Sequence, residues 1–96
     1  SAASDVYKRQ LLVIPGDVIV EELLETIVAK RTLVIMKVPL GEAVLRPFIA
    51  RHPELHYYYF EQVGTGQEYY SSVREEILGH SFTYFSILVI KPAFSR

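Results

Sequence analysis

The sequence predicts an α/β fold of three layers, in which helices cover both faces of a mainly parallel sheet. Runs of β-prone residues alternate along the chain with segments of helical periodicity, which is the pattern of β-α-β units. Short connections that contain proline or glycine join these segments. Half of the 96 residues are hydrophobic and 22% are charged, which excludes a disordered chain and fits one small domain.

Residues 1–10 differ in character from the rest of the chain. They are polar, lack apolar periodicity and stop where an aliphatic run begins at Leu11. All ten residues also match the translated end of a common sequencing-library adapter, so we interpret them as adapter-derived rather than native. We therefore treat residues 11–96 as a partial α/β domain, the carboxyl-terminal part of a longer one, and expect residues 1–10 to be extended and outside the core.

The first β-α unit spans residues 11–29. Its aliphatic strand is closed by a Pro-Gly turn, and Asp17 stands where the N-cap of a helix is expected. A helix is predicted over about Val18 to Ala29, because apolar side chains recur there at helical spacing while acidic ones fill the other side. The apolar positions are Val20, Leu23, Leu24, Ile27 and Val28.

The second β-α unit begins with residues 32–38, an apolar run of strand length without alternation. Such a run is typical of a strand that is covered on both faces. A helix is predicted to open at Gly41 and to bury Val44, Leu45, Phe48 and Ile49. Because Pro47 removes one helical hydrogen bond, we expect either a kink there or a helix that starts near Arg46.

The third unit begins with residues 55–63, an aromatic, β-prone run that predicts a strand packed beneath helices. Thr65 and Glu68 match a capping box, so a third helix is predicted to follow and to end at Gly79. Residues 81–91 form the last predicted strand and complete the order β-α-β-α-β-α-β. The apolar stripe of the third helix consists of Tyr69, Tyr70, Val73, Ile77 and Leu78.

Composition narrows the classes of function. The formal net charge of −1 provides no basic patch, so we expect no binding of nucleic acid. The absence of cysteine excludes disulfides, thiolate metal sites and cysteine nucleophiles. The apolar runs are far shorter than the ~20 residues that span a bilayer, so we expect a soluble domain without a membrane segment. None of this indicates a cellular location.

Three local patterns have a chemical and a purely structural interpretation. His52 and His56 have the i, i+4 spacing of metal ligands, with Glu54 between them, but that spacing needs a helix and a proline follows His52. We therefore expect no metal there. The turn at 64–66 lacks the residues of a phosphate-binding loop and is interpreted as a plain capped turn. His80 follows a helix-ending glycine, where interaction with the helix dipole is favoured over catalysis.

The predicted topology indicates one candidate site. In open parallel sheets, ligands bind beyond the carboxyl ends of the strands. Three polar clusters, at residues 15–17, 37–42 and 61–64, lie at the carboxyl ends of predicted strands and are expected to converge on one edge of the sheet. The alternative is that these polar residues merely end strands and cap helices.

The order of these segments resembles the carboxyl-terminal half of the FkbM-type class I methyltransferases, which bind S-adenosylmethionine. Lys37 and Gly41 can be placed on the Lys-Ile-Asp-Val-Glu-Gly type motif of that family. Pro39 stands where its aspartate would fall, and Glu42 follows the glycine, whereas the family's glutamate precedes it. The segments that carry the resemblance are Gly16-Asp17 with Leu23-Leu24, Val34–Leu45, Leu55–Glu61 and Ser81–Ile90.

The resemblance implies a partial Rossmann-like methyltransferase fold whose glycine-rich cofactor loop lies upstream of Leu11. It implies transfer of a methyl group from S-adenosylmethionine to a small-molecule or glycan acceptor, with no metal, and a fragment that is inactive by itself. Lys37, Glu42 and Glu61 are the residues expected to contact the substrate, and no catalytic base is assigned. The alternative is a non-enzymatic interaction module that pairs through an open strand edge or the Tyr57–Phe60 surface.

Overall fold

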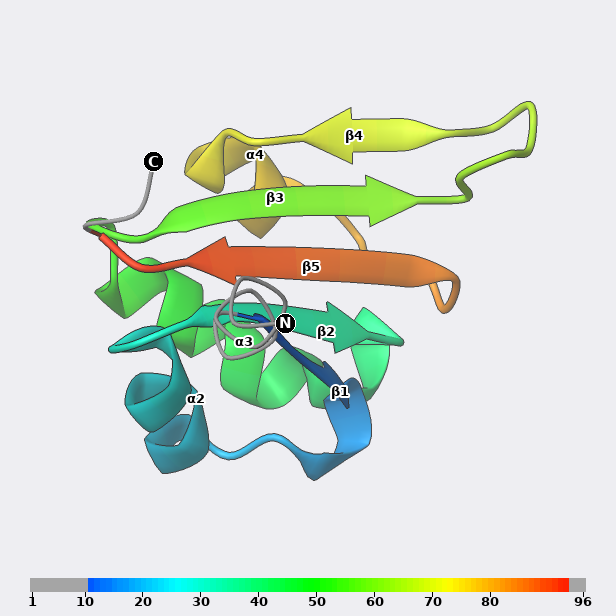
Figure 1. Ribbon diagram of the computed structural model, residues 1–96. Helices are drawn as coiled ribbons and strands as arrows, with labels where there is room; N and C mark the ends of the chain where they lie inside the picture. The colour runs from blue at the N-terminus through cyan, green and yellow to red at the C-terminus, as the bar shows by residue number, and fades with distance from the viewer. Residues whose placement is uncertain (1–10, 94–96) are drawn as a thin grey trace, which may run out of the picture.

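A computed structural model describes residues 11–93, which form one five-stranded sheet and three α-helices (Figure 1). The predicted α/β class is confirmed. The expectation for residues 1–10 concerns a segment outside the described range. In chain order the elements are β1 (Leu11–Pro15), the 3₁₀ turn η1 (Gly16–Val18), α2 (Glu21–Val28), β2 (Thr32–Met36), the 3₁₀ turn η2 (Val38–Gly41), α3 (Glu42–Arg51), β3 (His56–Glu61), β4 (Tyr69–Ser71), α4 (Arg74–Gly79) and β5 (Ser86–Lys91).

The sheet is mixed and mostly antiparallel, so the prediction of a mainly parallel sheet was wrong. Its strand order is β1-β2-β5-β3-β4. Only β1 and β2 pair in parallel, whereas the pairs β2–β5, β5–β3 and β3–β4 are antiparallel. The last strand therefore does not extend an edge of the sheet but lies between β2 and β3, in the opposite direction to both.

The direction of β5 follows from β4, a strand that we did not predict. Residues 69–71 pair with the free edge of β3 instead of forming the first turns of a helix, and α4 covers only residues 74–79. β4 carries the chain back across the sheet, and the segment containing α4 returns it to the carboxyl ends of β2 and β3 (Figure 1). Because of this extra crossing, β5 starts at that edge and runs antiparallel to its neighbours.

Thr65 and Glu68 stabilise a turn and do not form the predicted capping box of a helix. The Glu68 carboxylate accepts from the N–H of Gly64 at 3.2 Å, and the Thr65 hydroxyl accepts from the N–H of Gln67 at 3.0 Å. Tyrosines at 69 and 70 suit a strand, and the edge of β3 offers them main-chain partners. The predicted helix end at Gly79 is confirmed.

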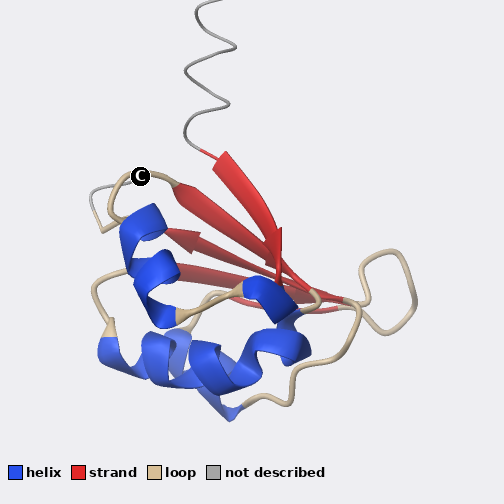
Figure 2. Ribbon diagram, turned by 90° about the horizontal axis from the view of Figure 1, so that it is seen from below, coloured by secondary structure: helices blue, strands red, loops and turns tan. Residues whose placement is uncertain are grey.

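The helices pack against one face of the sheet, so the molecule has two layers rather than the predicted three (Figure 2). Side chains alternate along each strand, which sends every second one into this single core. In β2, Leu33 and Ile35 are fully buried, whereas Met36 is exposed, so the expectation of cover on both faces was wrong. The largest fully buried side chains are Tyr59, Phe48, Leu24, Leu33, Ile35, Leu45, Ile49, Ile77, Leu88, Ile90 and Val38.

The other face of the sheet, which we call the open face, has no helix of the described residues on it (Figure 2). Strand registers place apolar side chains next to one another across it, and the rings of Phe60 and Tyr70 lie 4.9 Å apart. An apolar surface of this kind is typical of a region that contacts another layer or partner. Its apolar residues are Val13, Val34, Met36, Tyr58, Phe60, Tyr70, Ile87 and Val89.

The first helix begins later than predicted. Val20 is the N-cap of α2, without a side-chain hydrogen bond, and Asp17 lies in η1, so Asp17 is not the cap. Three of the five predicted apolar positions are buried in the core, whereas Val20 and Leu23 are exposed. The chain after β1 first packs against η2, which delays the start of the helix.

The second helix begins at Glu42 and runs through Pro47 to Arg51. A start near Arg46 was therefore wrong, whereas burial of Leu45, Phe48 and Ile49 is as expected. Pro47 is exposed, and so is Ala43, the residue one helical turn earlier whose carbonyl loses its partner. Water can satisfy that carbonyl, which explains why the helix tolerates the proline.

Replacing this proline by alanine is expected to stabilise the protein. An interior proline costs a helix about 3 kcal/mol, of which about 1 kcal/mol is offset because proline also restricts the unfolded chain. We therefore expect Pro47→Ala to raise the free energy of unfolding by about 1–2 kcal/mol in urea denaturation followed by circular dichroism. Pro53→Ala, in the turn beyond α3, is the matched control and should give no such gain. Equal effects of the two substitutions would contradict the claim that Pro47 destabilises α3.

Candidate functional site

The carboxyl ends of β1, β2 and β3 lie at the same edge of the sheet. β1 is parallel to β2, and β5 is antiparallel to both β2 and β3, so these three strands point in one direction (Figure 1). The amino end of β5 lies between them, where the N–H of Lys37 donates to the carbonyl of Ser86 at 3.2 Å and that of Gln62 to the carbonyl of Phe85 at 3.1 Å. The three polar clusters therefore reach one edge, as the sequence predicted.

At this edge the turns η1 and η2 pack main chain against main chain. A Cβ atom on Gly16 would lie 2.6 Å from the carbonyl oxygen of Lys37, and one on Gly41 would lie 2.5 Å from the carbonyl oxygen of Gly16. Both distances are shorter than any normal contact, so each position requires glycine. Because these glycines are used for close packing, neither leaves open space in which a ligand could approach the backbone.

Two residues at this edge have a left-handed backbone. Lys37 follows β2 with φ of 54°, and Gln62 follows β3 with φ of 55°. They are the only non-glycine residues with positive φ in residues 11–93. Such conformations are uncommon outside glycine, and they cluster at functional sites. Their position on both sides of β5 makes this edge the strongest candidate for a binding region.

A partly buried polar group lies on the helix side of this edge. We call it the Glu61 group, and it consists of Tyr59, Glu61, Tyr69 and His80. The Tyr59 hydroxyl donates to Glu61 Oε1 at 2.7 Å, and His80 Nε2 lies 2.8 Å from the same oxygen. The Tyr69 ring stacks on the His80 ring, with centroids 4.1 Å apart and planes 3° from parallel. Because a carboxylate only accepts hydrogen bonds, His80 Nε2 donates and Nδ1 is left as the proton acceptor.

Burial of two phenols at β3 predicts a loss of stability in alkali. Burial, followed by the hydrogen bond to Glu61, raises the pKa of Tyr59 above 10.0, and burial likewise raises the pKa of Tyr57. Both phenols therefore keep their proton in the folded state at a pH where the unfolded chain releases it. The contribution of each phenol to the free energy of unfolding is complete below pH 10. Above pH 10 this free energy falls by up to about 1.4 kcal/mol per pH unit for each phenol. Urea denaturation at a series of pH values measures this slope. An unchanged slope in Tyr59→Phe would contradict the assignment.

Glu42 is connected to the Glu61 group through Arg46. Arg46 Nε donates to Glu42 Oε2 at 2.5 Å, while its two other nitrogens donate to the carbonyls of Leu78 and His80, each at 2.6 Å. The guanidinium also lies 4.2 Å from the centre of the Phe82 ring. Glu42 therefore orients Arg46, which binds the backbone carbonyl of His80. The His80 side chain in turn contacts Glu61, so Glu42 and Glu61 belong to one network.

Lys37 lies apart from Glu42 and Glu61. It lines a pocket of about 390 Å³ on the open face, together with Phe60 and Tyr84, and its Nζ is 5.7 Å from the centre of the Tyr84 ring. Glu61 points to the opposite, helix-covered side. The structure thus brings two of the three predicted substrate-binding residues into one network and places the third across the sheet.

Sequence reasoning did not identify Arg46, Tyr59 or Tyr69 as parts of this site. The i, i+4 spacing of Glu42 and Arg46 was a signal for their ion pair. The i, i+2 spacing of Tyr59 and Glu61 was a signal that both share one face of a strand. No sequence signal indicated Tyr69, because its position depends on β4.

Comparisons with known proteins add no family assignment. No protein-family model matches the chain, and no curated protein shows significant similarity to it. Within residues 11–93, no helix has both the length and the apolar character needed to cross a membrane.

Proposed function

We propose that this chain is the carboxyl-terminal part of a methyltransferase-like α/β domain, which transfers a methyl group to a small-molecule or glycan acceptor. The observation that carries the proposal is the carboxyl edge of the sheet, where strained turns and a partly buried Glu61–His80 pair lie together. Ligands of open α/β sheets bind at such edges. The resemblance of segment order to the FkbM-type family supplies the reaction class.

The end of the sheet gives additional support. β5 is inserted antiparallel between two strands that point the same way. This resembles the class I methyltransferase sheet, in which the last strand likewise lies antiparallel between two neighbours.

In this proposal the chain provides the acceptor side of the site. An acceptor hydroxyl must lose a proton when it is methylated, and His80 Nδ1 can take that proton while Glu61 holds the opposite ring nitrogen. Glu42 acts through Arg46 to position the His80 backbone. The stacked Tyr69 ring restricts the rotation of the imidazole.

The described residues do not fit a cofactor site for S-adenosylmethionine. The two glycines at the edge are closed by main-chain atoms, so they form no open cradle for a ligand. In the proposal, the cofactor binds to sequence upstream of Leu11. We therefore expect calorimetric titration of S-adenosylmethionine into the 96-residue chain to show no saturable binding. One side of a binding pocket alone cannot bury most of the surface of a ligand. One-to-one binding at micromolar concentration would contradict this division of the site.

The proposed function itself is tested on the extended protein. Reading the coding sequence upstream of Leu11 should reveal a strand followed by a glycine-rich loop; an unrelated domain there would contradict the proposal. In that longer protein, His80→Gln should reduce the rate of methyl transfer by roughly 100-fold or more, the usual effect of removing a general base. His56→Gln, an exposed histidine at the other end of β3, is the matched control and should retain the rate.

The open face favours a second candidate, a non-enzymatic module that pairs through its sheet. Tyr57 and Tyr59 are buried beneath the helices, so only Tyr58 and Phe60 of the predicted aromatic surface are available there. If the open face pairs with the open face of a second copy of this chain, the chain should self-associate in sedimentation velocity experiments. Phe60→Lys should then make it monomeric. Ala50→Lys on the helix side is the matched control. A wild-type chain that stays monomeric at all concentrations would count against this candidate.

A further inference from the structure

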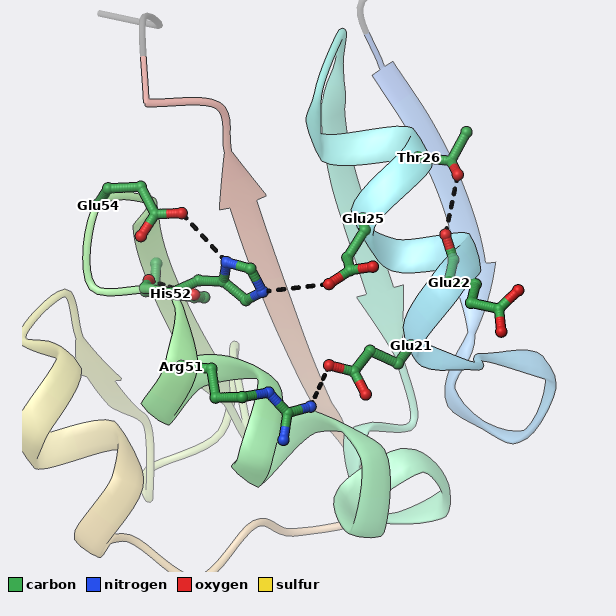
Figure 3. Close-up of polar contacts among 8 residues, drawn as sticks. Glu21, Glu22, Glu25, Thr26, Arg51, His52 and Glu54 are labelled. Carbon is green, nitrogen blue, oxygen red and sulfur yellow. Dashed lines mark hydrogen bonds and ion pairs between the residues drawn. The ribbon is translucent and has the colours of Figure 1, made fainter.

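A histidine and two glutamates meet at the packing interface of α2 and α3 (Figure 3). Glu21 and Glu25 lie one turn apart on α2, and His52 directly follows α3. One ligand atom from each of the three side chains lies within 4.8 Å of the other two. His52 Nε2 is 3.6 Å from Glu25 Oε2. This cluster shares no residue with the Glu61 group.

The imidazole of His52 is oriented so that Nε2 faces the carboxylates. Its Nδ1 lies 3.1 Å from Glu54 Oε2, which accepts the ring N–H (Figure 3). The Phe48 ring lies against the imidazole, with ring centroids 4.3 Å apart. A carboxylate on the far ring nitrogen is the arrangement that orients histidines which bind metals through the other nitrogen. The Nε2 lone pair therefore points toward Glu25.

His52 Nε2 is also an unsatisfied buried atom. It is shielded from solvent and has no hydrogen-bond partner among residues 11–93. His52 Nε2 is within ion-pair distance of Glu25 Oε2, at 3.6 Å, but this distance is too long for a hydrogen bond. A buried polar atom without a partner calls for an explanation such as an ion.

We propose that His52 Nε2 and the carboxylates of Glu25 and Glu21 form a site for one divalent transition-metal ion, such as Zn²⁺. Zinc binds nitrogen and oxygen at about 2.0–2.2 Å, so neighbouring ligand atoms in a tetrahedral site lie roughly 3.4 Å apart. The observed 3.6 Å between His52 and Glu25 already matches this spacing. Imidazole favours zinc and similar metals over Mg²⁺, which prefers oxygen ligands alone.

The surroundings of the cluster leave room for a fourth ligand. A pocket of about 330 Å³ adjoins it, lined by Glu25, His52, Glu54 and apolar residues. With three protein ligands, the fourth tetrahedral position would open to water or to a small ligand in this pocket. Arg51 pairs with Glu21 and competes with the metal for that carboxylate (Figure 3).

Calorimetric titration of ZnCl₂ into the metal-free 96-residue chain tests this site. We expect one-to-one binding with a micromolar dissociation constant and a matching rise in melting temperature, because a ligand that binds only the folded state stabilises it. Titration with MgCl₂ under the same conditions should give no binding. The absence of zinc binding, or equal binding of Mg²⁺, would overturn the proposal.

Substitutions of the proposed ligands and of their neighbours test where the zinc ion binds. His52→Gln and Glu25→Gln should each weaken zinc binding by at least about tenfold, and Glu54→Ala should weaken it by about tenfold through loss of histidine orientation. Arg51→Gln should strengthen it by about two- to fivefold, because it releases Glu21 from an exposed ion pair. His56→Gln, in a histidine outside the cluster, is the control. Zinc binding that survives His52→Gln or is lost in His56→Gln would refute this assignment, and circular dichroism shows that each variant is folded.

Discussion

Substitution of Gly16 by alanine is expected to destabilise the protein by about 2–3 kcal/mol. The added methyl would lie 2.6 Å from the carbonyl oxygen of Lys37 and 3.1 Å from the nitrogen of Gly41. Both are main-chain atoms, so the two turns must separate, and overpacking of this kind costs typically 1–3 kcal/mol. Thermal and urea unfolding followed by circular dichroism measure the loss.

Gly66→Ala is the matched control for this experiment. A Cβ atom at Gly66 would meet no heavy atom within 4 Å, and its φ is not in the left-handed range. Its effect should be within about 0.5 kcal/mol of zero, as for most surface substitutions. Gly41→Ala should resemble Gly16→Ala, and the double variant should cost less than the two losses added together, because both relax the same contact. If Gly16→Ala behaved like Gly66→Ala, the close approach of the two turns would be refuted.

The second large effect is expected at Glu61. Glu61→Ala removes the acceptor for the Tyr59 hydroxyl and for His80 Nε2, and it leaves these donors in a buried region. A buried donor without a partner costs about 1–3 kcal/mol, so we expect a loss of about 2–3 kcal/mol in the free energy of unfolding. The N–H of Thr83 still donates to the Tyr59 oxygen at 3.2 Å, but it does not replace the lost acceptor.

Glu61→Gln separates the hydrogen bonds from the charge. The amide oxygen of glutamine can accept from the Tyr59 hydroxyl, so the loss should be about 1 kcal/mol or less. A comparable loss in both variants would show that the negative charge, rather than the acceptor, stabilises the pair. The same two variants bear on the proposed function, since a carboxylate stabilises a His80 that has taken up a proton more strongly than a neutral amide does.

Local patterns predicted most of the elements but not their boundaries. Leu45, Phe48 and Ile49 recur at helical spacing and are buried in α3, because an apolar stripe on one side of a helix needs no distant information. The start of α2 was placed too early, because Asp17 resembles an N-cap although it belongs to a turn that packs against η2. The capping pattern at Thr65 and Glu68 misled in the same way, since its hydrogen bonds stabilise a turn as readily as a helix.

The candidate site was predictable only in part. Glu61 and Glu42 were chosen because they belong to polar clusters at the ends of predicted strands, and they belong to one network through Arg46. Lys37 was chosen for the same reason, but its left-handed backbone places it on the open face. The metal cluster was not predictable from spacing, because His52 meets Glu21 and Glu25 of another helix rather than its sequence neighbour His56.

The sequence by itself determined the α/β class, the first two strand–helix units and the buried positions of α3, because these depend on periodicity over a few residues. The tertiary structure decided the direction of β5, the number of layers and the partners of Glu61 and His52. Strand β4 forms because the free edge of β3 satisfies its main-chain groups, and no local preference of Tyr69 or Tyr70 reveals that edge. That one pairing adds a crossing of the sheet, reverses β5, and brings the ring of His80 between Tyr69 and Glu61.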